Sequence, residues 1–133
     1  MSVEFLLDTN ILSDIIRNPR GAAAAEHRRR RAVTAISIVV AAELSYGLRK
    51  NPAYRYSERA EQLLNAVPIL PLEEPADARY AELRARLTRQ GRPLGPNDYW
   101  IAAHALALDC TLVTANVGEF RRVPGLRVEN WLA

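Results

Sequence analysis

Two kinds of hydrophobic pattern alternate along this chain. Short apolar runs, typical of buried strands, occupy residues 3–7, 33–36, 69–72, 111–114 and 126–129. Between these runs, apolar residues recur at intervals of three and four, which is the period of an amphipathic helix. The helical pattern covers residues 11–16, 22–31, 38–50, 57–66, 74–90 and 96–108, with a short helical turn at 117–122.

This alternation of strands and helices predicts an α/β domain. Strands that are separated by helices pair in parallel, and the helices then cover both faces of the sheet. We therefore expect a three-layer α/β/α sandwich around a parallel sheet of four to five strands. No internal repeat, linker or second domain interrupts the pattern, so residues 1–133 should form a single domain.

The composition excludes several other classes of protein. Hydrophobic residues make up 49% of the chain, which is enough for a globular core and too many for a disordered protein. No apolar run approaches the roughly 18 residues of a membrane span, and no basic leader precedes the first strand, so we expect a cytoplasmic protein that does not bind membranes. Cys110 is the only cysteine, which rules out an internal disulfide and predicts a buried, inert thiol.

The charge is mildly basic, with a net value of +3, and almost all of it comes from arginine. Arginine suits bidentate contact with phosphate, so nucleic acid is a compatible partner, although a GC-rich genome produces the same bias. The run at residues 28–31 is four arginines, which we expect to form either a solvated helix face or an RNA-facing patch.

Asp8 ends the first strand and precedes the first helix. A carboxylate in this position either caps the helix or lies at the edge of the sheet where α/β proteins bind ligands. Three further acids occupy comparable positions: Glu43 within a helix of otherwise buried appearance, Asp98 in the first turn of its helix, and Glu119 after the fourth strand. Each has a separate structural explanation, but their joint occurrence favours one acidic site.

Such a site requires a cation, because clustered carboxylates repel one another. Oxygen-only ligands suit Mg²⁺ or Mn²⁺, and a hard dication in a carboxylate pocket is equipped for phosphoryl chemistry. His104 lacks a second histidine or a cysteine at metal-binding spacing, so we expect a structural histidine that is hydrogen-bonded beneath its helix. The sequence motifs of serine hydrolases and of nucleotide-binding loops are absent from the sequence.

These motifs together resemble those of the PIN-domain ribonucleases, and in particular the VapC-type toxins of toxin–antitoxin operons. The resemblance spans essentially the whole chain. The matching stretches are Phe5-Leu6-Leu7-Asp8-Thr9-Asn10, Ala35-Ile36-Ser37 with Ala42-Glu43-Leu44 and Tyr46-Gly47, Gly95-Pro96-Asn97-Asp98 with Ile101-Ala102-Ala103-His104-Ala105, Val113-Thr114-Ala115-Asn116 with Glu119-Phe120, and finally Pro124-Gly125-Leu126 and Glu129-Asn130-Trp131.

The resemblance implies a PIN-like sandwich and an endoribonuclease that uses Mg²⁺ or Mn²⁺ to cut structured RNA such as tRNA. It also implies a homodimer silenced by a cognate VapB-type antitoxin, with operator DNA bound only through that antitoxin. The implied metal ligands are Asp8, Glu43 and Asp98, with Glu119 as a fourth catalytic acid. The implied supporting residues are Asn10, Ser37, Thr114 and Asn116.

One departure from the family pattern leaves an alternative open. Many relatives have Asp where this chain has Asn116, so the fourth acid must be Glu119 or absent, and occupancy of a second metal site is in doubt. A PIN module that binds RNA or protein without catalysis is therefore the second interpretation. An aspartate-nucleophile phosphatase is a third, but it would need a second Asp at position 10 and a lysine after Lys50.

Overall fold

The computed structural model describes residues 2–132, and within them five strands form one parallel sheet. The strands are β1 (Phe5–Leu7), β2 (Thr34–Ser37), β3 (Ile69–Leu70), β4 (Thr111–Val113) and β5 (Val128–Glu129). Their order across the sheet is β3-β2-β1-β4-β5, with every neighbouring pair parallel. The first strand, β1, is therefore central, and it pairs with β2 on one side and with β4 on the other.

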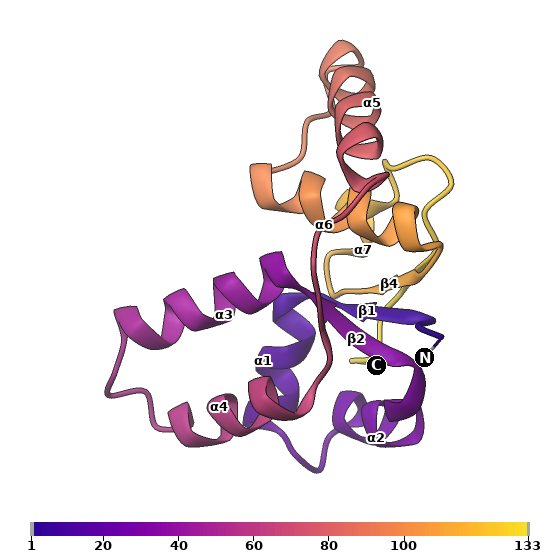
Figure 1. Ribbon diagram of the computed structural model, residues 1–133. Coiled ribbons are helices and arrows are strands. Elements are labelled where there is room, and N and C mark those ends of the chain that lie inside the picture. The colour runs from indigo at the N-terminus through magenta and orange to yellow at the C-terminus, as the bar shows by residue number, and fades with distance from the viewer. Residues whose placement is uncertain (1, 133) are drawn as a thin grey trace.

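Helices cover both faces of this sheet, as the alternating pattern predicts (Figure 1). The helices α1, α2 and α4 lie on one side, and α5 and α6 lie on the other, while α3 extends from the end of β2. The described helices are α1 (Thr9–Arg17), α2 (Ala22–Arg29), α3 (Ile38–Lys50), α4 (Ser57–Ala66), α5 (Ala76–Arg89), α6 (Pro96–Leu108) and the short α7 (Val117–Phe120), with a 3-10 turn, η1 (Arg31–Val33). The three-layer α/β/α sandwich is confirmed.

Every predicted element is present, although several are shorter than expected. The third strand ends at Leu70 rather than at residue 72, because Pro71 has no N–H to continue the ladder. The second helix ends at Arg29, and η1 connects it to β2. The edge strands β3 and β5 have two residues each, since each pairs with a neighbour on one side alone.

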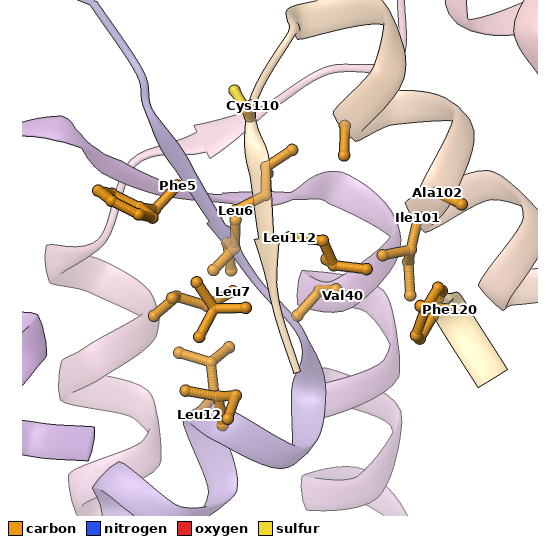
Figure 2. Close-up of a cluster of buried hydrophobic side chains, with 14 of the residues drawn as sticks. Phe5, Leu6, Leu7, Leu12, Val40, Ile101, Ala102, Cys110, Leu112 and Phe120 are labelled. Carbon is orange, nitrogen blue, oxygen red and sulfur yellow. The ribbon is translucent and has the colours of Figure 1, made fainter. Parts of the chain in front are cut away.

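The core forms between the sheet and both helical layers (Figure 2). The side chain of Leu7 points toward Leu12 of α1, whereas that of Leu112 points toward Ile101 of α6. All four side chains are almost completely buried. Burial on both faces is the reason that these strands are apolar throughout instead of alternating. Cys110 is also buried, as expected.

The run of arginines at residues 28–31 is exposed except at one position, which is compatible with both a solvated face and an RNA-facing patch. Arg28, Arg29 and Arg31 are exposed, but Arg30 is half-buried. Its guanidinium carbon lies 4.7 Å from the centroid of the Phe5 ring and its Nε lies 3.1 Å from the Glu26 carboxylate. Arg30 therefore helps to hold α2 against the sheet. Among the described helices, none is long and apolar enough to cross a membrane.

Candidate active site

A crevice for a ligand is expected where the order of strands reverses. The chain moves from β1 to β2 and β3 on one side of the sheet, and then places β4 and β5 on the other side. Open α/β sheets bind ligands outside the carboxyl ends of the strands at such a switch point. Asp8 follows β1 and Thr114 follows β4 at this edge.

Asp8 both caps a helix and contributes a carboxylate to this edge, so the two interpretations of its position hold together. Its Oδ1 accepts a 2.8 Å hydrogen bond from the backbone N–H of Thr9, the first residue of α1. Its Oδ2 accepts a hydrogen bond of 2.7 Å from the Thr114 hydroxyl and one of 3.3 Å from the Asn10 amide. Although the side chain is only 3% exposed, the carboxylate is well supplied with donors.

Asn10 and Thr114 join the ends of the two central strands. The Asn10 amide also lies 3.4 Å from the Thr114 hydroxyl, and its Oδ1 accepts a 3.0 Å hydrogen bond from the Ala115 N–H. The Thr114 hydroxyl accepts a 3.0 Å hydrogen bond from the Asn116 N–H. These contacts hold the turn after β4 against the start of α1, and they orient the Asp8 carboxylate.

Glu43 reaches the same edge from α3 and is half-buried. Its Oε1 accepts a 2.6 Å hydrogen bond from the Thr9 hydroxyl, and its Oε2 accepts a 3.1 Å hydrogen bond from the Asn97 amide. Thr9 and Asn97 were not among the predicted site residues. Their positions in the sequence could have indicated a role at the site, because Thr9 directly follows Asp8 and Asn97 directly precedes Asp98.

The carboxylates lie near enough to affect one another's ionisation. Burial, together with the charges of Asp8, Glu119 and Glu43, raises the pKa of Asp98 from 3.8 to about 6. Burial also raises the pKa of Asp8, and the charge of Glu43 adds to this effect, while hydrogen bonds from Thr114, Thr9 and Asn10 oppose it. An acid in the first turn of a helix ordinarily favours its ionised form, so burial and the neighbouring carboxylates outweigh the effect of the α6 N-terminus on the pKa of Asp98.

Two of the other predicted site residues lie at the margin of this cluster. Glu119 and Asn116 are exposed, on α7 and at its N-cap respectively. Neither side chain has a hydrogen bond among the described residues, but the charge of Glu119 reaches Asp98. Glu119 therefore lies near enough to affect Asp98, but no hydrogen bond among the described residues fixes its side chain.

Ser37 lies outside the carboxylate network. Its hydroxyl caps α3 by accepting a 3.1 Å hydrogen bond from the Val39 N–H, and it lies 2.8 Å from Nδ1 of the buried His104. Burial lowers the pKa of His104, and a hydrogen bond with the backbone at Pro71 opposes the change. His104 thus has the structural role expected of it, and Ser37 supports the start of α3 that carries Glu43.

The donor set fits a hard divalent cation. Within residues 2–132, none of the carboxylates of Asp8, Glu43, Asp98 and Glu119 forms an ion pair with an Arg, Lys or His side chain. Carboxylate oxygens without an internal cation suit Mg²⁺ or Mn²⁺. No three acidic, histidine or cysteine side chains in this range lie close enough to enclose an ion as they stand. To enclose an ion, these side chains would have to move toward one another.

The comparisons with known proteins all indicate the same family. Residues 5–126 match the model of the PIN domain. The chain is 36% identical over 130 residues, which is 97% of this chain and 98% of the relative, to the tRNA(fMet)-specific endonuclease VapC of Shigella flexneri. It is 40% identical over 98 residues, or 73% of each protein, to ribonuclease VapC2 of Rickettsia felis.

The solved structures agree. The crystal structure of VapBC2 from Rickettsia felis, bound to a DNA fragment from their promoter, contains a chain with a TM-score of 0.88 to this one. The two chains are 33% identical, and the match covers 97% of this chain and 99% of that one.

Proposed function

The chain belongs to the PIN-domain family of VapC-type ribonucleases, and on that premise we propose that it is a metal-dependent endoribonuclease and the toxin of a toxin–antitoxin pair. The observation that carries the proposal is the convergence of three acids at one edge of the sheet: Glu43 accepts hydrogen bonds from Thr9 and Asn97, the sequence neighbours of Asp8 and Asp98. The raised pKa of Asp98, caused by burial and by the charges of Asp8, Glu119 and Glu43, agrees with this. An acid with a raised pKa among other acids, at the sheet edge where α/β proteins bind ligands, is a candidate functional residue. The absence of an ion pair with these acids among residues 2–132 leaves their charge available to a dication.

The residues of the cluster have distinct roles in this proposal. Asp8, Glu43 and Asp98 would bind Mg²⁺ or Mn²⁺, and Glu119 would add charge from α7. When bound, the ion supplies the positive charge that makes water a nucleophile at neutral pH and that stabilises the leaving oxygen. Asn10 and Thr114 hold Asp8 in one orientation through hydrogen bonds that are already present.

We propose structured RNA, and tRNA in particular, as the substrate. The Shigella relative is a tRNA(fMet)-specific endonuclease, and the many exposed arginines of this chain suit contact with RNA phosphates. We also propose a cytoplasmic homodimer that is held inactive by a VapB-type antitoxin. A basic side chain of the antitoxin would occupy the carboxylate cluster in place of the metal, and operator DNA would be bound only through the antitoxin.

Incubation of the purified protein with total RNA tests this function. We expect discrete cleavage products in millimolar Mg²⁺ or Mn²⁺, none in EDTA, and recovery when the metal is restored, because the proposed mechanism depends on a metal ion to lower the pKa of water. Mapping the new RNA ends would identify the substrate. Cleavage that persists in EDTA would contradict the metal mechanism, whereas RNA binding without cleavage under any condition would support a silent PIN module.

Glu119→Gln should raise the Mg²⁺ concentration for half-maximal cleavage by a few-fold, and Asn116→Asp should lower it. Glu119 contributes a full negative charge near Asp98, while Asn116 contributes none. Both residues are exposed, so neither substitution should affect folding. The measurement is a metal titration of the initial cleavage rate. Unchanged titrations for both variants would mean that Asp8, Glu43 and Asp98 suffice and that water completes the coordination.

A further inference from the structure

We infer that Thr9 and Asn97 are positioning residues that hold the Glu43 carboxylate beside Asp8 and Asp98, from where it can join them in binding a metal ion. This inference rests on the proposed function. The two residues donate to different oxygens of one carboxylate: the Thr9 hydroxyl to Oε1 at 2.6 Å and the Asn97 amide to Oε2 at 3.1 Å. Glu43 is thereby connected to α1 and to α6 at once.

The arrangement links the three acids through their sequence neighbours. Thr9 follows Asp8 directly at the start of α1, and Asn97 precedes Asp98 directly in the first turn of α6. Each of these helix starts therefore presents one acid to the cluster and one neutral donor to Glu43. The two hydrogen bonds set the distance of Glu43 from both other acids, although 34 and 54 residues of chain separate it from its donors.

The neutral character of the donors is important. An arginine or lysine beside Glu43 would hold it more firmly, but its charge would compete with the metal. A hydroxyl and an amide orient the carboxylate and leave its charge intact. A carboxylate has about four lone-pair sites, so one hydrogen bond on each oxygen leaves sites free for an ion.

Glu43 has no other fixed support among the described residues. It is half-buried and lies beside Ala42, which is exposed, so packing alone does not restrict its flexible side chain. Thr9 is a suitable donor because a β-branched residue in a helix has few side-chain rotamers. Asn97 is exposed, so its hydrogen bond competes with water. We therefore expect Thr9 to have the larger effect.

Calorimetric titration of the purified protein with Mn²⁺ tests the inference without requiring catalysis. Thr9→Val removes the hydroxyl and keeps the shape, and we expect it to weaken Mn²⁺ binding by about tenfold, the lower end of the effect of residues that orient metal ligands. Asn97→Ala should weaken binding by a few-fold. Thr9→Ser retains the donor and should bind Mn²⁺ within about twofold of wild type. Saturating metal should restore most of the cleavage rate of Thr9→Val, since the ligands remain.

Thr34→Val is the matched control. The Thr34 hydroxyl is buried and donates a 2.7 Å hydrogen bond to the Arg30 carbonyl, at the amino end of β2, away from the carboxylates. Its removal should lower thermal stability and leave Mn²⁺ affinity unchanged. If Thr9→Val does not fold, Asn97→Ala at the surface still tests the inference.

The outcomes separate the inference from the proposed function. Wild-type Mn²⁺ affinity in both Thr9→Val and Asn97→Ala, with an active wild type, would overturn the inference alone. An equal loss in Thr9→Ser and Thr9→Val would also overturn it, because packing rather than the hydroxyl would then be responsible. A wild-type protein that neither binds Mn²⁺ nor cleaves RNA would overturn the proposed function itself.

Discussion

Asp98→Asn is expected to reduce RNA cleavage by at least about 100-fold, because loss of a direct metal ligand should exceed the 10- to 100-fold effect of residues that only support one. Asp98 lies in the first turn of α6, directly after Asn97, whose amide is hydrogen-bonded to Glu43, and the charges of the other acids contribute to its raised pKa. The substitution preserves the shape of the side chain and removes its charge. The measurement is the initial rate of cleavage at saturating Mg²⁺.

Asp109→Asn is the matched control, and its rate should stay within about twofold of wild type. Asp109 terminates the same helix at the opposite end, is exposed, and pairs with Arg127 at 3.0 Å. Its backbone is left-handed, with φ of 54°, a conformation that Asn also tolerates. Equal losses in the two variants would mean that the catalytic site lies elsewhere.

The same substitution, Asp98→Asn, should stabilise the metal-free protein. In EDTA at pH 8 we expect the free energy of unfolding to rise by about 1 kcal/mol, which corresponds to a melting temperature higher by about 4 °C. The full change in the pKa of Asp98 would imply a larger stabilisation. We expect less because Asp98 is only half-buried and solvent screens its charge. The physical reason is that the native state partly buries this carboxylate and holds it near three others.

The sign of the pH dependence follows from the direction of the pKa shift. The pKa of Asp98 is about 6 in the folded protein and 3.8 as its ordinary value, so the folded state binds more protons between these values. Wild-type stability should therefore fall as pH rises from about 4 to about 6, on account of this group. The advantage of Asp98→Asn should be absent near pH 3.5 and complete above pH 7. Thermal melts across this range provide the measurement.

Metal should reverse the difference in stability. Mg²⁺ binds the native wild type and stabilises it by mass action, whereas Asp98→Asn has lost a ligand. A variant that melts lower than wild type in EDTA would contradict the repulsive site and would indicate a structural aspartate. Asp8→Asn is less informative for this purpose, because Asp8 also caps α1 and accepts three hydrogen bonds.

The sequence alone was sufficient to determine the fold class. Apolar runs such as residues 111–114 and helical periods such as 96–108 depend on local spacing, and both elements are found close to their expected positions. The observed ends of elements differ from the predicted ones where strand pairing stops or a proline interrupts the strand, as at Pro71. The convergence of Asp8 and Asp98 was also predictable, because parallel strands and the helices that follow them meet at one edge of the sheet.

Tertiary structure decided which neutral side chains support these acids. Thr9 was not among the predicted site residues, whereas Ser37 was predicted to support the site. In the folded protein the Thr9 hydroxyl binds Glu43, while Ser37 pairs with His104. Spacing along the chain determines which face of an element a residue occupies. A hydrogen bond between residues 34 or 67 positions apart depends on how two helices pack, to within a few tenths of an ångström, and no local pattern contains that distance.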